Sequence, residues 1–541
     1  MDATAHAEMP ANEPALAHEP GSGARTELLA TLEDLSDSVT EAPCVIAGKD
    51  VTTGTTSPVR PPHRHADVVA EVQAATTDVV TDAIEAATAA RGEWQAMEPS
   101  DRLAIFRRAA DLLSGPWRAR LNAATMLGQS KTIQQAEIDS ACEMIDFWRF
   151  NPYWVEQIAA RQPLSADGVT NEFDLRPLDG FVLAICPFNF TSIAGNLPTA
   201  PAMCGNTVVW KPSGNQALSA HLTMRLLQEA GLPDGVINLV HGEGALVAER
   251  CLADPRLAGL HFTGSAAVFK GLWQRIGANI GSYRQFPRIV GETGGKDFIL
   301  AHASADEEAL ATAIIRGAFE YQGQKCSAAS RMYVPASRWD QLRARLVDIT
   351  QSLAMGDVAD PTTFLGAVID EKAMHKHQAL FDRVAADPAV ELVTGGWTDA
   401  TDGWFVAPTI LRTSDPRHET MTTEYFGPII TAFVYDDGLW EDTLELVDTT
   451  SPYGLTGAVF ATDEDAIAMA RTRLRFSAGN FYVNDKPTGA VVGNQPFGGA
   501  RGSGTNDKAG SEANLHRWIS PRIVKHNHQP PTAYGYPSMN V

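Results

Sequence analysis

Long apolar runs, cysteine and positive charge are all scarce in this chain. Of its 541 residues 44% are hydrophobic, but no uninterrupted apolar run reaches about 18 residues, the length that a helix needs to cross a membrane. The six cysteines are scattered, and no two share CxxC spacing. We therefore expect no membrane span and no disulfide framework, and reduced thiols favour a cytoplasmic location.

Basic residues are outnumbered by acidic ones. Lys and Arg total 43 against 65 Asp and Glu, a formal net charge of −22. Such a surface repels a phosphate backbone, so we expect no nucleic acid partner. A small anionic substrate would need a local site lined by amide and hydroxyl donors.

Two kinds of binding motif are also missing. No GxGxxG follows a predicted strand, so a standard dinucleotide fingerprint is absent, although a modified site stays open. Neither HExxH nor paired-cysteine spacing surrounds the three close histidine pairs, His63/His65, His375/His377 and His526/His528. We expect these histidines to be solvent-exposed and assign no metal.

The composition is that of a globular protein, and the length suits two or three domains. The first residues carry several acidic residues, Pro and Gly, with no Lys or Arg before Arg25. That pattern is neither a secretory signal nor a basic transit peptide. We expect residues 1–25 to form a disordered leader.

Apolar periodicity organises the remaining residues. Residues 26–160 are predicted to be mainly helical, and after Gly180 short apolar strands alternate with helices. This alternation predicts an α/β fold, with a parallel sheet covered by helices on both faces. Residues 161–179 predict an exposed β-hairpin around Asp167-Gly168. A second α/β run occupies 291–512, and residues 513–541 show few signals of a core of their own.

A reactive pair lies in two glycine-containing segments. Cys326 occurs in Gly323-Gln324-Lys325-Cys326-Ser327, and Glu292 occurs upstream in Gly291-Glu292-Thr293-Gly294-Gly295-Lys296. A thiol can attack a carbonyl and a carboxylate can activate water, so the pair suggests covalent acyl chemistry completed by hydrolysis. A buried, inert cysteine is the ordinary alternative.

The ends of predicted strands supply further candidates. Asn189 could donate its amide to an oxygen that becomes negative during the reaction, or it could simply stabilise a turn. Lys211 suits ribose or phosphate recognition, although a surface lysine is the common alternative. Gly264 and Ser265 lead into a helix whose free N–H groups could face a pyrophosphate.

Taken in order, these segments closely resemble the aldehyde dehydrogenase superfamily, from about Val45 to Lys525. The motifs that carry the resemblance are Pro187-Phe188-Asn189-Phe190, Trp210-Lys211-Pro212-Ser213, Phe262-Thr263-Gly264-Ser265, the Glu292 and Cys326 segments, and Glu424-Tyr425-Phe426-Gly427-Pro428. Residues 479–486, 495–501 and 503–508 resemble the branch that oxidises L-glutamate γ-semialdehyde, the open form of Δ1-pyrroline-5-carboxylate.

The resemblance implies an aldehyde dehydrogenase-like fold in a homo-oligomer. Its parts would be a Rossmann-like NAD domain (26–160 and 180–290), an α/β catalytic domain (291–512) and a small β oligomerisation element (161–179 and 513–541). The implied activity is NAD-dependent oxidation of the semialdehyde to L-glutamate, the second step of proline catabolism. A separate proline dehydrogenase would carry out the preceding step and is a candidate partner.

The resemblance also implies roles for individual residues. Cys326 would be the nucleophile, Asn189 the oxyanion donor and Glu292 the base that activates water. The implied cofactor contacts are Cys186, Lys211, Gly264, Ser265, Glu424 and Phe426. The implied substrate contacts are Phe190, Ser327, Gly489, Ala490 and Phe497.

Two positions depart from the pattern of the superfamily. Gly214 stands where many members carry a glutamate for the adenosine ribose, which removes one group that would exclude a 2′-phosphate; we still expect NAD⁺ rather than NADP⁺. Ala490 stands where some close relatives have serine.

Three alternative functions remain. The chain could oxidise another short anionic aldehyde, such as succinate semialdehyde, or be a non-catalytic structural homologue. The joint presence of Cys326, Glu292 and Asn189 argues against the second of these. A CoA-acylating relative is disfavoured because those enzymes lack the glutamate that Glu292 supplies.

Overall fold

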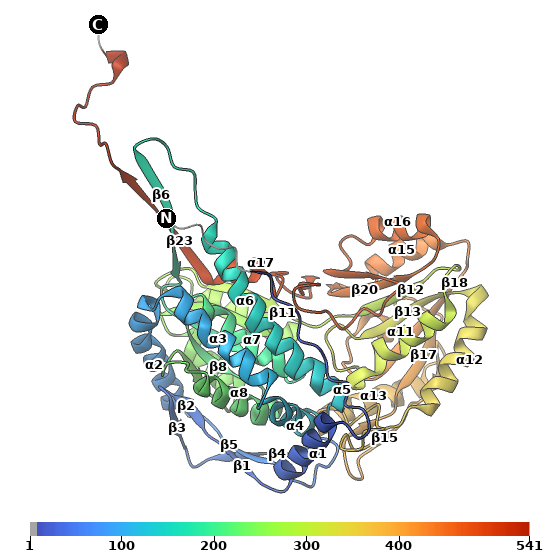
Figure 1. Cartoon of the computed structure of the whole chain (residues 1–541). Helices are drawn as coiled ribbons and strands as arrows, with labels where there is room; N and C mark the ends of the chain where they lie inside the picture. Colours follow the sequence, from blue (N-terminus) through green and yellow to red (C-terminus); the bar gives the residue numbers. More distant parts are fainter. Residues whose placement is uncertain (1–7, 540–541) are drawn as a thin grey trace.

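The computed structural model describes residues 8–539, which form two α/β units, each built on a seven-stranded sheet (Figure 1). In spatial order the strands of the first sheet are β11 (Arg288–Glu292), β10 (Leu257–Thr263), β7 (Phe181–Ile185), β8 (Thr207–Lys211), β9 (Ile237–Leu239), β2 (Cys44–Ile46) and β3 (Lys49–Val51). From β11 to β9 neighbouring strands are parallel, and β2 and β3 are antiparallel additions. The carboxyl ends of the parallel strands therefore meet at one edge.

Helices cover both faces of this sheet, because its central strands are apolar on both sides. One face packs against α2 (Thr77–Ala96), α9 (Gly244–Leu252) and α10 (Ala266–Ala278). The other face shares a core with α3 (Pro99–Ser114), α4 (Arg118–Gln129), α6 (Glu143–Ala160), α7 (Thr191–Met203) and α8 (Ala217–Glu229).

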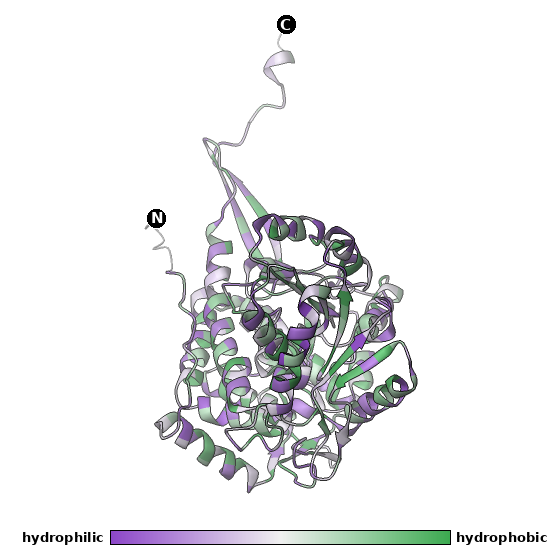
Figure 2. Ribbon diagram, turned by 90° about the vertical axis from the view of Figure 1, so that its right-hand side faces the viewer, coloured by the Kyte–Doolittle hydropathy of each residue, from purple (hydrophilic) through white to green (hydrophobic). Residues whose placement is uncertain are grey.

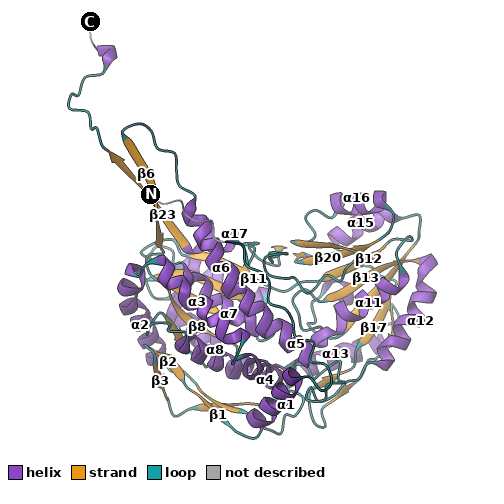
Figure 3. Cartoon of the chain, viewed as in Figure 1, coloured by secondary structure: helices purple, strands orange, loops and turns teal. Residues whose placement is uncertain are grey.

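The second sheet is also mostly parallel. Its strands are β14 (Val390–Thr394), β17 (Thr409–Thr413), β18 (Ile429–Tyr435), β13 (Ala329–Pro335), β12 (Asp297–Ala301), β20 (Thr456–Phe460) and β21 (Asn480–Val483), with β14 antiparallel at one end. Helices α11 (Glu307–Phe319) and α12 (Ala336–Ser352) share a core with one face, and α15 (Trp440–Thr449) and α16 (Glu464–Arg473) share a core with the other (Figure 3).

A two-stranded ribbon projects from the body (Figures 1 and 2). It pairs β6 (Val169–Pro177) antiparallel with β23 (Ile519–Asn527) along their full length. The expectation of a self-contained hairpin over 161–179 is therefore wrong: one strand forms there, and its partner comes from the C-terminal segment. Alternating exposed residues predict a strand equally well in either case, but local sequence does not identify the distant partner.

The N-terminal region is more ordered than expected. Helix α1 (Gly23–Ser36) begins at Ser22, whose side chain caps it. Before it, Asn12, Glu13 and Leu16 form hydrogen bonds with residues more than a hundred positions away. The expectation of a disordered leader is thus wrong for residues 8–25, while residues 1–7 lie outside the described residues. Within 8–539 no helix is both long and apolar enough to span a membrane.

Candidate functional site

The first sheet brings four predicted residues to its carboxyl edge. Asn189 follows β7, Lys211 ends β8, Ser265 follows β10 and Glu292 ends β11. Because neighbouring parallel strands carry these segments, their side chains converge where α/β sheets bind ligands.

Lys211 and Ser265 are both held by local hydrogen bonds at this edge. Lys211 is buried, its Nζ donates to the Pro212 carbonyl at 2.7 Å, and burial lowers its pKa; it is not a surface lysine. The Ser265 hydroxyl accepts from the Val268 N–H and caps α10. That cap leaves other N–H groups of the first turn available to an anion.

Cys186 directly follows β7 at this edge, but its side chain is buried in the core. Its side chain is buried and accepts a hydrogen bond from Trp210 Nε1 at 3.3 Å. Its thiol is therefore occupied, and its backbone N–H donates to the Lys211 carbonyl at 3.0 Å, which leaves only its carbonyl for a cofactor.

The loop that contains Cys326 (residues 323–327) lies between α11 and β13, at the amino edge of the second sheet. Two residues just before it, Tyr321 and Gln322, have left-handed backbones with φ of 52° and 54°. Such conformations are costly for side-chain-bearing residues and persist where surrounding contacts over-determine them. Here the Gln322 amide donates to the Ser130 and Ala367 carbonyls at 3.1 and 2.7 Å. The loop is therefore held in one conformation.

Cys326 lies where two cavities meet. One, of about 240 Å³, is also lined by all five predicted substrate contacts, Phe190, Ser327, Gly489, Ala490 and Phe497. The other, of about 20 Å³, is also lined by Gly295, Lys296, Glu424 and Phe426. The thiol thus stands between the predicted substrate contacts and two of the predicted cofactor contacts.

Desolvation and neighbouring negative charges both raise the pKa of the Cys326 thiol. Desolvation raises the pKa of Cys326 far above its ordinary value, and the nearby carboxylates of Asp297, Glu292 and Glu424 raise it further. Burial likewise raises the pKa of Asp297 to about 8 and lowers that of Lys296 to about 7. At neutral pH the thiol is therefore protonated in this structure, and a proton acceptor is needed to form the thiolate.

Asn189 and Glu292 are both engaged with backbone groups. Asn189 Nδ2 donates to the Gln324 carbonyl at 2.9 Å, two residues before the nucleophile. An amide carries two N–H hydrogens, so one remains free for a substrate oxygen. Glu292 accepts from the Gly499 N–H at 2.7 Å, and burial raises its pKa well above the ordinary carboxyl value.

A buried charged cluster on the wall of the larger cavity was not predicted. Asp139 pairs with Lys131 at 2.5 Å and with Lys325 at 3.2 Å. Glu143 accepts from Ser192 at 2.6 Å, and burial raises its pKa to about 8. Asp139 lies on the π-helical segment Glu137–Cys142, a feature frequent at functional sites. No local motif marks these residues, because they converge only through helix packing.

Two histidines also differ from expectation. His63 and His377 are buried, so the prediction that the histidine pairs are exposed is wrong at these two positions. Desolvation lowers the pKa of His377 to about 3, and its ring packs against Gly427, beside Phe426. Among residues 8–539 no group of three or more His, Cys, Asp or Glu is arranged to hold a metal ion.

Comparison with known proteins places this geometry in context. The aldehyde dehydrogenase family model matches residues 50–524. The chain is 46% identical over 530 residues to the mitochondrial delta-1-pyrroline-5-carboxylate dehydrogenase of Danio rerio, covering 98% of this chain and 95% of that protein. The Homo sapiens protein of the same name is 45% identical over 530 residues, with coverage of 98% and 94%.

A solved structure is more similar to this chain than these two relatives are. The Delta-pyrroline-5-carboxylate dehydrogenase from Mycobacterium tuberculosis bound with NAD superposes with a TM-score of 0.96 at 53% identity. The match covers 100% of both chains.

Proposed function

Because this chain belongs to the aldehyde dehydrogenase family, we propose that it oxidises L-glutamate γ-semialdehyde to L-glutamate with NAD⁺. The semialdehyde is the open form of Δ1-pyrroline-5-carboxylate, and its oxidation is the second step of proline catabolism. The observation that carries the proposal is the position of Cys326 between a cavity lined by Ser327, Gly489 and Ala490 and a second lined by Glu424.

The larger cavity suits a short anionic aldehyde. Ser327 donates to Thr488 Oγ1 at 2.8 Å, which leaves the Thr488 hydroxyl hydrogen free to form a donor-lined end with the backbone N–H groups of Gly489 and Ala490. Phe190 and Phe497 supply apolar walls for the methylene stem. Such a site binds a carboxylate without a net positive surface.

The first chemical step belongs to Cys326. Its Sγ attacks the aldehyde carbon while the thiol proton passes to water in the cavity, because the thiol is protonated beforehand. The free N–H of Asn189, with the Cys326 backbone N–H, stabilises the negative oxygen of the thiohemiacetal. One such donor contributes about 3 kcal/mol to transition-state stabilisation.

Residues at the two facing edges fit a dinucleotide. The buried Lys211 suits ribose hydroxyls, the first turn of α10 suits a pyrophosphate, and Glu424, held by the Gly295 N–H at 2.9 Å, suits the second ribose. When bound, NAD⁺ supplies the hydride acceptor. No side chain projects from Gly214, so discrimination against a 2′-phosphate rests on the surrounding backbone.

Glu292 completes the reaction by activating water to hydrolyse the thioester. Burial raises its pKa well above the ordinary carboxyl value, so its carboxylate is a stronger base toward water than a free carboxylate. In the structure it is tied to Gly499, so it must turn toward the thioester in this step. A CoA-acylating enzyme would not need this group.

Assembly and location belong to the same proposal. The projecting β6–β23 ribbon presents unpaired strand edges, which supports a homo-oligomer built on this element. All six cysteines are free, which supports a reducing compartment such as the cytoplasm, although the vertebrate relatives carry mitochondrial names. A separate proline dehydrogenase, which supplies the substrate, is the candidate partner.

A substrate panel tests this function. Wild-type protein and Cys326→Ala should be assayed with glutamate semialdehyde, succinate semialdehyde and propionaldehyde, each with NAD⁺ and NADP⁺. We expect the highest kcat/KM with glutamate semialdehyde and NAD⁺, and loss of NADH formation in the variant. Cys251→Ala, at a buried thiol outside both cavities, is the control.

Three other outcomes would decide against the proposal. Equal kcat/KM for the two semialdehydes would favour a general short-chain enzyme. Wild-type protein that forms no NADH with any aldehyde, and whose Cys326 resists alkylation, would be a non-catalytic homologue. Activity retained in Cys326→Ala would overturn the assignment of the nucleophile.

A further inference from the structure

The substrate cavity has a wall from an unexpected part of the chain. Asn12, Glu13 and Ala15 line it beside Cys326 and Ser327. We name residues 12–16 the N-terminal strap. In Figure 1 this dark blue segment runs alongside α6, on which Asp146 accepts hydrogen bonds from the strap. A segment more than three hundred residues from the nucleophile thus borders the proposed aldehyde site.

Asn12 connects helix α6 to residues 488–492, which line the substrate cavity. Its Nδ2 donates to Asp146 Oδ2 and to the Val492 carbonyl, each at 2.7 Å. Val492 ends the stretch 488–492, every residue of which lines the cavity. Because α6 is buried in the core, the two hydrogen bonds of Asn12 tie this loop to a rigid element.

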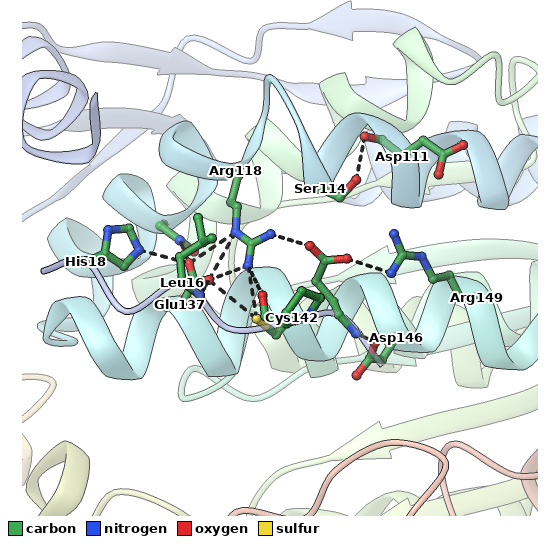
Figure 4. Close-up of polar contacts among 12 residues, drawn as sticks. Leu16, His18, Asp111, Ser114, Arg118, Glu137, Cys142, Asp146 and Arg149 are labelled. Carbon is green, nitrogen blue, oxygen red and sulfur yellow. Dashed lines mark hydrogen bonds and ion pairs between the residues drawn. The ribbon is translucent and has the colours of Figure 1, made fainter. Parts of the chain in front are cut away.

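Ion pairs fix the strap itself. The Glu13 carboxylate, almost entirely buried, pairs with Arg149 at 2.7 Å and with Arg118. Arg118 also pairs with the fully buried Glu137, which accepts from the Leu16 N–H at 2.8 Å. Figure 4 shows Arg118 beside Glu137. The buried charges of Glu13 and Glu137 are therefore both paired with arginine, and these ion pairs hold the strap next to Asn12 in place.

We propose that Asn12 is a positioning residue for the carboxylate end of the substrate. By holding Val492, it keeps the preceding Gly489 and Ala490 N–H groups aimed at one point in the cavity. Substrate carboxylate binding then depends on Asn12, whereas attack by Cys326 and cofactor binding do not. The inference rests on the proposed function, because it assumes an anionic aldehyde.

The kinetic test uses Asn12→Asp, which keeps the side-chain shape but lacks both donors, and Asn12→Ala. We expect the KM for glutamate semialdehyde to rise about tenfold while kcat and the KM for NAD⁺ stay within about twofold. With propionaldehyde, which has no carboxylate, kcat/KM should stay within about twofold. Glu19→Gln is the control, since Glu19 is an exposed strap neighbour.

An unchanged KM in both variants, or an equal loss with propionaldehyde, would overturn the proposal. If wild-type protein oxidises propionaldehyde but not glutamate semialdehyde, the proposed function fails instead, and alkylation then decides about the strap. Cys326 is partly exposed and the other cysteines are buried, so iodoacetamide and the bulkier N-phenylmaleimide report its accessibility. We expect a looser loop to raise the maleimide rate relative to the iodoacetamide rate in both variants; an unchanged ratio contradicts the inference.

Discussion

The carboxylate of Glu292 accepts a hydrogen bond of 2.7 Å from the backbone N–H of Gly499. Glu292 ends a strand of the first sheet, whereas Gly499 belongs to the C-terminal loop of the second unit. The contact therefore joins the two units at the reaction centre. It also fixes the carboxyl group that we propose as the base.

We predict that Glu292→Gln separates the two halves of the reaction. Glutamine still accepts from Gly499, so the fold is kept, but it cannot take a proton from water. Steady-state NADH formation should fall at least about 100-fold, while a first-turnover burst near one NADH per site persists. Rapid-mixing absorbance measures both, with the exposed Glu33→Gln as control. A variant that loses the burst as well would show that Glu292 acts before hydride transfer.

Gly295→Ala should displace the nucleophile. A Cβ at this position would lie 2.7 Å from the Cys326 carbonyl oxygen and 2.3 Å from Asp297 Oδ2. Since a shift of about 1 Å in a reacting group can cost about 100-fold, we expect kcat to fall between tenfold and about 100-fold. Steady-state kinetics provide the measurement. Gly92→Ala, in α2 with open space around it, should leave kcat unchanged; similar effects of the two changes would contradict the steric argument.

Asp297 should make the protein less stable as pH rises. Burial raises its pKa to about 8, whereas an unfolded aspartate titrates near about 3.9. Between these values the folded chain holds a proton that the unfolded chain has released, so the free energy of unfolding falls with increasing pH. This contribution is full below the unfolded pKa and is lost as pH passes the folded pKa.

Asp297→Asn should remove that part of the pH dependence. Asparagine still accepts the 2.7 Å hydrogen bond from the Thr456 N–H. Thermal unfolding at about pH 5 and about pH 8 should show a smaller drop in Tm for the variant than for wild type. The exposed Asp340→Asn should keep the wild-type drop. Identical drops in wild type and Asp297→Asn would contradict the raised pKa.

Ala490→Ser should strengthen substrate binding. Ala490 lines the carboxylate end of the cavity, and an added hydroxyl contributes about 1 kcal/mol, or about fivefold in KM. We expect a lower KM for glutamate semialdehyde, with KM for propionaldehyde unchanged. An equal change for both aldehydes would mean that the serine acts on the loop rather than on the carboxylate.

Local sequence predicts the strand-bound parts of the site well. Asn189, Lys211 and Ser265 each follow an apolar strand, and parallel pairing brings such positions to one edge. The buried cluster of Asp139, Lys131 and Lys325 has no such signal, because helix packing joins residues that are far apart in the sequence. The partner of β6 is unpredictable for the same reason.

The sequence alone was enough to predict the proposed catalytic groups of this protein: a thiol at Cys326, a carboxylate at Glu292 and an amide at Asn189, in the order of a known superfamily. Residue type and local motifs suggested these groups, and the ordered set of motifs that resembles the superfamily assigned their roles. Tertiary structure alone decided the environment of that thiol, including the desolvation that raises its pKa and the N-terminal strap beside it. Desolvation and long-range hydrogen bonds depend on which distant segments pack together, and local sequence does not encode that directly.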